Sequence, residues 1–195
     1  MVIASRAILK SMQYDLKKFI NAVLFFAEKV DKLGITKLNK LLYYVDFEHF
    51  RLYGRPVLGD RYRRMEQGPV PELSYSTFNA NFRDNQDSSL KELIDVVPET
   101  VFSFKRSKII AKSHPDLSIF SKSEIDILKQ VVEKWHNVNA REIVGQSHLE
   151  RPWKETPDLA VIDYKLALDQ QGSISHEYAN YREKEDQMLE DALSA

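Results

Sequence analysis

Hydrophobic positions recur every three or four residues along two segments near the start of the chain. In residues 15–31 this spacing places apolar side chains on one helical face, and Leu24, Phe25 and Phe26 widen that face. Residues 36–53 carry a similar stripe, and their aromatic side chains cover much of the remaining circumference. A helix that is apolar on most sides belongs in the interior of a fold. The pattern therefore predicts two helices that pack together at the centre of the molecule.

Glycine, threonine and proline mark the expected ends of these two helices. We expect Gly34 to end the first helix, because glycine adopts the left-handed C-terminal conformation at little cost. Thr36 is expected to cap the second helix. Gly54 is expected to end it, and Pro56 to prevent it from resuming.

Shorter elements are predicted after the second helix. Residues 57–66 are expected to be extended, and the tripeptide at residues 67–69 is a turn signal. A helix is predicted over residues 71–82, with its proline as the first residue. Between residues 93 and 111, short β-prone runs separated by polar residues predict a small antiparallel meander.

Two capping boxes predict helix starts in the second half of the chain. Ser121 precedes Glu124 by three residues, and Asn139 precedes Glu142 by the same spacing. In such a pair each side chain bonds a backbone N–H that the helix leaves free. We expect a helix after each of these caps.

The domain organisation follows from the absence of any internal repeat or low-complexity linker. Further helices are predicted over residues 158–169 and 175–192, and the last one is acidic. The expected fold class is α+β and predominantly α-helical, with a small antiparallel β element. We expect one domain over residues 1–172, and an acidic C-terminal helix over residues 173–195 that packs on this domain or extends from it.

Composition narrows the classes of partner and chemistry. The chain has 195 residues, of which 43% are hydrophobic and 29% charged, and its formal net charge is −1. This balance gives no electrostatic reason to expect nucleic acid or an anionic membrane as the main partner. The absence of cysteine excludes disulfides and thiolate chemistry, and fits a cytoplasmic protein. No secretory signal is apparent, and the longest strongly apolar run, residues 22–27, is too short to span a membrane.

Motifs for catalysis and metal binding are missing from the sequence. There is no glycine-rich phosphate loop, no nucleophile elbow and no paired histidines at ligand spacing. His49 lies in the most apolar segment, where we expect a hydrogen-bonded core residue. The sequence therefore predicts no enzyme activity, no cofactor and no metal. An enzyme would need a site built from residues such as Asp46, His49 and Glu66, whose proximity the sequence does not reveal.

Two surfaces are candidates for binding a partner. Arg61, Tyr62, Arg63 and Arg64 lie in the predicted extended segment, and arginine and tyrosine are favoured anchors in protein interfaces. The alternative for this segment is an edge strand that its charges keep soluble.

Residues 121–153 loosely resemble a helix-turn-helix, so a nucleic-acid-binding regulator is the alternative function. Five basic residues in that segment are matched by five acidic ones, which is unfavourable for binding phosphate.

Four short segments, in their order along the chain, resemble a known family. They are KLLYYVD at residues 40–46, GRPV at 54–57, EQGPV at 66–70 and SHLERPW at 147–153. The first three resemble the core signature of the Panacea domain, also known through SocA-like and GepA-like proteins, and the fourth resembles its second signature. The resemblance covers about residues 15–155.

The resemblance implies an antitoxin that neutralises a cognate toxin encoded beside it. It also implies a protease or chaperone as a further candidate partner, since SocA-like members are associated with delivery of the toxin to a protease. Members of the family neutralise diverse toxins. We therefore expect the residues of the shared signature to stabilise the fold and not to select the toxin. The signature positions expected to be structural are Lys40, Leu41, Tyr43, Tyr44, Asp46, Gly54, Gly68, Pro69, Val70, His148, Pro152 and Trp153.

Overall fold

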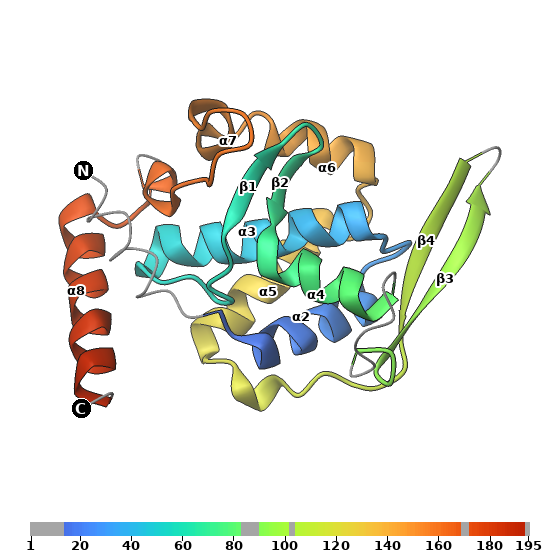
Figure 1. Cartoon of the computed structure of the whole chain (residues 1–195), viewed down its shortest axis with the longest axis horizontal. Helices are drawn as coiled ribbons and strands as arrows, with labels where there is room; N and C mark the ends of the chain where they lie inside the picture. The colour runs from blue at the N-terminus through green and yellow to red at the C-terminus, as the bar shows by residue number, and fades with distance from the viewer. Residues whose placement is uncertain (1–13, 83–89, 102–103, 169–171, 194–195) are drawn as a thin grey trace.

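The predicted fold class is confirmed: the molecule is mainly helical, with two small antiparallel sheets of two strands each (Figure 1). The computed structural model describes residues 14–82, 90–101, 104–168 and 172–193. Helix α3 (Ile35–Tyr53) runs through the centre of the body, and its residues 37–47 are all buried. The wide apolar face of this helix thus has the interior position that its sequence predicts.

Two helices cover the central helix on one side. Asp15 is the N-cap of helix α2 (Leu16–Lys29), and its carboxylate accepts the backbone N–H of Lys18 at 3.0 Å. Helix α5 (Lys122–Trp135) packs on both α2 and α3. An ion pair of 2.7 Å between Lys18 and Glu124 joins α2 to the start of α5. Helices α2 and α3 are also in direct contact, so the predicted packing of the first helix on the second is confirmed.

The turn between α2 and α3 differs from the prediction. Gly34 is the N-cap of α3 and does not end α2, which ends at Lys29 with Val30 as its C-cap. A side chain at Gly34 would place its Cβ 3.0 Å from the carbonyl oxygen of Ser107, so this glycine permits a close approach of two backbones. Gly54 ends α3 in the left-handed conformation, as predicted.

Two β-hairpins follow the central helix. Strand β1 (Tyr62–Met65) pairs with β2 (Gly68–Pro71), so the turn lies at residues 66–67 and not at the predicted 67–69. Helix α4 (Glu72–Phe82) follows β2 directly. In place of a meander of short runs, β3 (Ile94–Val101) and β4 (Phe104–Ala111) form one longer hairpin, which extends from one end of the body (Figure 1).

Both predicted capping boxes are present. Ser121 and Glu124 cap α5, and Asn139 and Glu142 cap the short helix α6 (Ala140–Ser147), in each case with both reciprocal hydrogen bonds. The remaining short elements are η1 (Leu117–Ile119), α7 (Arg151–Glu155) and η2 (Tyr164–Ala167).

The predicted helix over residues 158–169 is wrong, because only the single turn η2 is helical there. Residues 159–162 instead lie beside β1, after a turn in which Leu159 has a positive φ: Arg64 N–H donates to the carbonyl of Ala160, and Ile162 N–H donates to that of Tyr62. These backbone bonds to a strand far away in sequence replace the local bonds of a helix.

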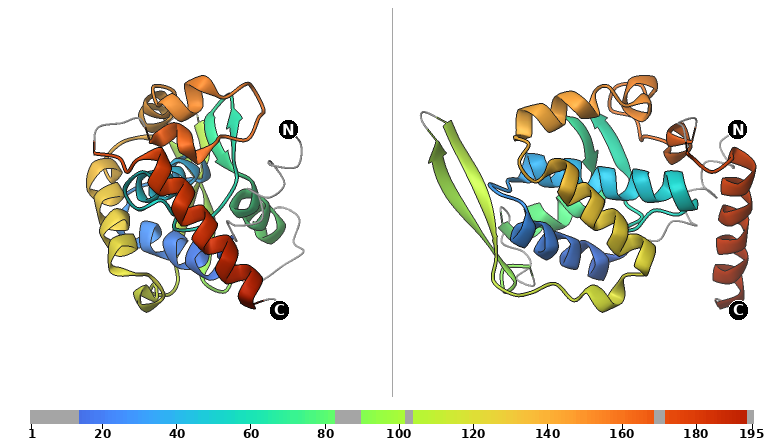
Figure 2. Two further views of the ribbon diagram at one scale, coloured as in Figure 1. Left: turned by 90° about the vertical axis from the view of Figure 1, so that its left-hand side faces the viewer. Right: turned by 180° about the vertical axis from the view of Figure 1, so that it is seen from behind.

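The acidic helix α8 (His176–Leu193) lies at the end of the molecule opposite the β3–β4 hairpin (Figures 1 and 2). Its Ala179 is buried, and its Glu185 and Asp186 both form ion pairs with Arg55. Thus α8 is attached to the rest of the chain through one buried position and a set of charged contacts. None of the helices described here is long and apolar enough to cross a membrane.

The central position of α3 predicts a large loss of stability when its core is truncated. Leu42 has 0% exposed surface, so Leu42→Ala should lower the free energy of unfolding by about 2–5 kcal/mol. Leu189→Ala on the exposed side of α8 is the control and should change it by less than about 0.5 kcal/mol. Urea denaturation of both variants measures the difference. Equal stabilities would contradict the assignment of α3 as the core helix.

Candidate functional site

Three of the signature segments meet at one point beside the β1–β2 hairpin. The Nζ of Lys40 on α3 donates a hydrogen bond of 2.8 Å to the carbonyl of Pro69 on β2. A Cβ added to Gly68 would lie 2.5 Å from the Oγ of Ser147 on α6 and 2.6 Å from the Cε of Lys40. Glycine at residue 68 is therefore required for α3, β2 and α6 to pack this closely.

The second signature holds the other strand of the same hairpin. The indole N–H of Trp153 donates to the carbonyl of Met65 at 3.3 Å, and its ring stacks on His148 with 4.0 Å between centroids. The guanidinium of Arg64 lies over the Trp153 ring at 4.1 Å and also pairs with Asp158. Burial, with the positive charges of Lys40 and Arg64 nearby, lowers the pKa of His148.

A buried carboxylate organises the chain around the hairpin. Asp46 on α3 has 0% exposed surface and accepts the backbone N–H groups of Val57 and Leu58 at 2.8 and 2.6 Å. It also accepts the hydroxyl groups of Tyr62 on β1 and Tyr164 on η2, at 3.0 and 3.1 Å. One side chain thus fixes the loop after α3, strand β1 and the turn η2.

A second buried acid continues this network. Asp60 accepts the backbone N–H groups of Leu73 and Ser74 at 3.0 and 2.7 Å, and so satisfies free donors at the start of α4. Its own carbonyl lies 2.7 Å from the hydroxyl of Tyr164, which is also 3.1 Å from Asp46. A tyrosine hydroxyl carries a single hydrogen, so Tyr164 donates to only one of these two acceptors at a time.

The remaining signature positions also belong to the scaffold. Tyr43 is buried against Tyr62, and Tyr44 stacks on Trp135 with ring centroids 4.7 Å apart. Leu41 is buried in the same core. Three further positions lie within or at the end of an element: Gly54 at the end of α3, Val70 in β2 and Pro152 in the first turn of α7.

The four residues of the candidate contact segment lie in different environments. Tyr62 is buried with 0% exposed surface, so its side chain is part of the core. The side chains of Arg61 and Arg63 are 47% and 40% exposed, and both form ion pairs with Glu72. Arg64 is held by Asp158 and Trp153. Only Arg61 and Arg63 thus combine exposure with a position on a rigid support.

The edge-strand alternative for this segment is wrong. The outer backbone groups of β1 are paired with residues 159–162: Leu159 N–H donates to the carbonyl of Arg64 at 2.9 Å, and Arg64 N–H donates to that of Ala160 at 2.9 Å. Strand β1 is therefore not open for a partner to add a further strand. The two strands and residues 159–162 form a closed support for the exposed arginines.

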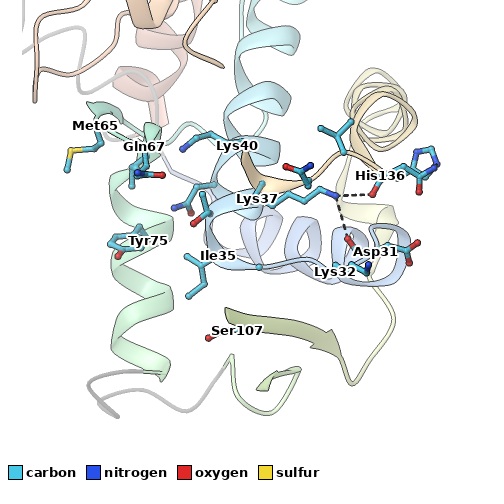
Figure 3. Close-up of a pocket in the computed structure, with 18 of the residues that line it drawn as sticks. Asp31, Lys32, Ile35, Lys37, Lys40, Met65, Gln67, Tyr75, Ser107 and His136 are labelled. Carbon is cyan, nitrogen blue, oxygen red and sulfur yellow. Dashed lines mark hydrogen bonds between the residues drawn. The ribbon is translucent and has the colours of Figure 1, made fainter. Parts of the chain in front are cut away.

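A cleft with a volume of about 820 Å³ opens beside the hairpin turn (Figure 3). Its walls come from the first turns of α3, from residues 65–67, from α4, from β4 and from residues 136–140. The Nζ of Lys37 holds one wall in place by donating to the carbonyl of His136 at 2.9 Å. This cleft could not be predicted from the sequence, because its walls come from five separated segments.

The residues considered for an enzyme do not meet in one site. His49 is buried, with its Nδ1 2.6 Å from the carbonyl of Arg55 and its Nε2 3.1 Å from the hydroxyl of Ser123. A carbonyl only accepts, so Nδ1 carries the proton and Nε2 accepts from Ser123. Asp46 bonds to a different set of groups, and Glu66 lies on the exposed hairpin turn. The residues that the structure describes contain no cluster of three or more potential metal ligands.

Comparison with protein families gives one match. The family described as antitoxin SocA-like, Panacea domain, matches residues 38–154. This range begins in the first turn of α3 and ends in α7, so it includes the hairpin and its contacts with Lys40, Ser147 and Trp153. Searches of curated proteins and of solved structures gave no match.

The packing around Gly68 predicts that even one methyl group there is destabilising. Gly68→Ala should lower the free energy of unfolding by about 1–2 kcal/mol from its positive φ of 84°, and by about 1–3 kcal/mol more from overpacking against Ser147 and Lys40. Gly145→Ala on α6 is the matched control, because a Cβ there would meet no atom within 4 Å. It should stabilise the protein by about 0.5–1 kcal/mol. Urea denaturation that shows the same change for both variants would contradict the close packing at Gly68.

The buried carboxylate predicts a dependence of stability on pH. Burial raises the pKa of Asp46 to about 7 from its ordinary 3.8, and outweighs the opposing effect of its hydrogen bonds. The folded state then keeps a proton that the unfolded chain releases between these values, so the contribution of Asp46 to stability is greatest at low pH. The free energy of unfolding should fall as pH rises from about 4 to 7, by up to about 1.4 kcal/mol per unit.

Asp46→Asn is the reference for this measurement, because it removes the titrating group and leaves Asp60 in place. The stability of the wild type relative to the variant should decrease between pH 5 and pH 7 in urea denaturation. A relative stability that stays constant over this range would mean that the carboxylate is already ionised in the folded state.

Proposed function

Because this chain belongs to the SocA-like, Panacea-domain antitoxin family, we propose that it neutralises a cognate toxin by binding directly to it. The family suggests a non-enzymatic role, and the signature residues support this view because they hold the fold together. Tyr43, Asp46 and Gly68 are buried in contacts within the chain. The choice of toxin is then set mainly by exposed residues that the signature does not fix.

The exposed side of the β1–β2 hairpin is the contact surface that we propose. Arg61 and Arg63 are both directed to one carboxylate, that of Glu72, so the face around these two arginines keeps one positive charge in excess, while Glu66 on the turn is negative. The turn residues Met65 and Gln67 are exposed next to these arginines and border the cleft. The observation that carries the proposal is this exposed pair of arginines on a hairpin that Asp46 and Trp153 hold rigidly. Rigid arginine anchors lose little conformational entropy on binding.

Helix α8 is the rival surface. It carries several acidic residues, which would steer a basic toxin toward it. It also exposes Tyr178, Tyr181, Met188 and Leu189. We assign this helix to a later step, the presentation of the bound toxin to a protease, because it lies at the end of the body while the arginines lie on the hairpin.

The alternative of a nucleic-acid-binding regulator gains nothing from helix α6. The exposed residues of this short helix include Arg141 and Glu142, whose opposite charges give no excess for binding phosphate. Its Ile143 and Ser147 are buried against the body. We therefore keep toxin binding as the proposed function.

Co-expression with the toxin encoded by the neighbouring gene tests the hairpin surface. Arg61→Glu combined with Arg63→Glu should abolish protection of the cells, because the surface changes from positive to negative. Lys122→Glu combined with Lys129→Glu on the exposed face of α5 is the matched control and should protect fully. The thermal melt of each variant establishes that it is folded.

A chain truncated before Ser173 separates the two surfaces. We expect it to retain protection, because binding through the hairpin suffices to inactivate the toxin, while toxin levels rise if protease presentation is lost. If the folded arginine variant protects fully and the truncated chain does not, α8 is the essential contact and the proposal for the hairpin is wrong.

A further inference from the structure

The cleft beside the hairpin contains a buried ammonium group without an acidic partner. Lys40 has 1% exposed surface, and its Nζ donates to the carbonyl of Pro69 at 2.8 Å. An ammonium has three N–H donors, and no carboxylate of the described residues forms an ion pair with this one. A buried charge that lacks a counter-ion is costly, so proteins seldom keep one without a use.

A second buried polar side chain in the cleft has no partner. Asn39 has 7% exposed surface and lines the cleft, yet its amide forms no hydrogen bond within the part of the chain that the structure describes. None of its amide atoms is fully enclosed without a partner, so the amide reaches the open space of the cleft, where a ligand can bind it. Asn39 and Lys40 are neighbours on α3, so two groups in need of a partner lie on the wall of the same cleft.

The start of α3 contributes further donors to this cleft. Gly34 caps the helix without any side-chain hydrogen bond, and the residues of the first turn, Ile35, Thr36 and Lys37, all line the cleft. Their backbone N–H groups have no partner within the helix, and the positive end of the helix dipole lies there. The Nζ of Lys37 is already bonded to the carbonyl of His136 and supports the wall.

The other walls indicate the kind of anion. Ile35, Met65, Val70 and Tyr75 provide apolar surface beside the donors (Figure 3). No arginine lines the cleft, and Asp31 and Glu66 are also among its residues. This charge balance suits a group with one negative charge attached to apolar atoms better than a phosphate, which arginine forks commonly bind.

We propose that the cleft binds a carboxylate of the toxin, either an acidic side chain or the C-terminus, together with an adjacent apolar side chain. The proposal rests on the proposed function and identifies the chemistry of the toxin segment that the antitoxin recognises. Lys40, Asn39 and the first-turn N–H groups of α3 receive the carboxylate. Met65 and Tyr75 contact the neighbouring apolar group.

The protonation of Lys40 offers a direct readout of this site. Burial without a counter-ion lowers the pKa of Lys40 to about 7. A carboxylate beside the ammonium favours its charged form, so binding raises this pKa. The charge of Lys40 also contributes to the lowered pKa of His148, so an anion that offsets this charge should raise the pKa of His148 as well.

The first experiment uses sodium acetate as the probe and needs no toxin. The ¹³Cε resonances of labelled lysines are followed in the full chain, and the signal missing from Lys40→Met identifies Lys40. Acetate should shift this signal in a saturable way and raise its pKa, whereas sodium chloride at equal ionic strength should not. No saturable shift, or tighter binding of inorganic phosphate than of acetate, would overturn the carboxylate site.

The second experiment measures binding to the toxin by calorimetry. Asn39→Leu has almost the same volume and removes no hydrogen bond within the described residues, so it should fold normally and weaken binding by about 10-fold or more. Lys40→Met should weaken it similarly. Lys129→Met on the exposed face of α5 is the matched control and should bind as the wild type does.

The outcomes separate this proposal from the proposed function. If Arg61→Glu with Arg63→Glu prevents binding but Asn39→Leu and Lys40→Met do not weaken it, the toxin binds the hairpin and the cleft proposal is wrong. If acetate binds but no toxin complex forms, the carboxylate site exists, but the proposed function is wrong. The toxin is then not the ligand of this site. A toxin with an amidated C-terminus distinguishes the two sources: loss of affinity assigns the C-terminus, and unchanged affinity assigns an acidic side chain.

Discussion

The fold depends on one buried carboxylate. Asp46 lies on the central helix and receives hydrogen bonds from the loop after that helix, from Tyr62 on β1 and from Tyr164 on η2. Segments that are up to 118 residues apart in sequence therefore meet at a single side chain. Because Tyr62 on β1 donates to a side chain of α3, the position of the β1–β2 hairpin is tied to the position of α3. The hairpin can present exposed groups rigidly because its buried side is fixed in this way.

The signature residues are distributed as a scaffold would require. Lys40, Gly68 and Trp153 bring α3, the hairpin and α7 together, and each does so through a specific close contact. Their chemistry is used within the chain, with the exception of the Lys40 ammonium, which also borders the cleft. Proteins that share this signature can therefore keep the same support while the residues exposed on it differ, which fits a family whose members act on different toxins.

Local sequence signals predicted the elements whose stabilisation is local. The capping boxes at Ser121 and Asn139 are present because each needs only residues three positions apart. Predictions failed where a distant segment decides the outcome. Residues 159–162 pair with β1 and are not helical, and Gly34, close to the backbone of Ser107, caps the start of α3 and does not end α2. Tyr62 could not be placed in the core from alternation alone, because its acceptor, Asp46, belongs to another element. The cleft escaped prediction for the same reason.

The central claim is that the hairpin turn and the adjoining cleft form the surface that binds the toxin. Hydrogen–deuterium exchange of the chain, alone and with its toxin, tests it most directly, because the backbone N–H groups of residues 65–67 and of the first turn of α3 lie at this surface. The account predicts that the complex slows exchange at residues 35–37 and 65–67 and leaves α8 unchanged. Slower exchange confined to α8, with no change at these residues, would contradict it.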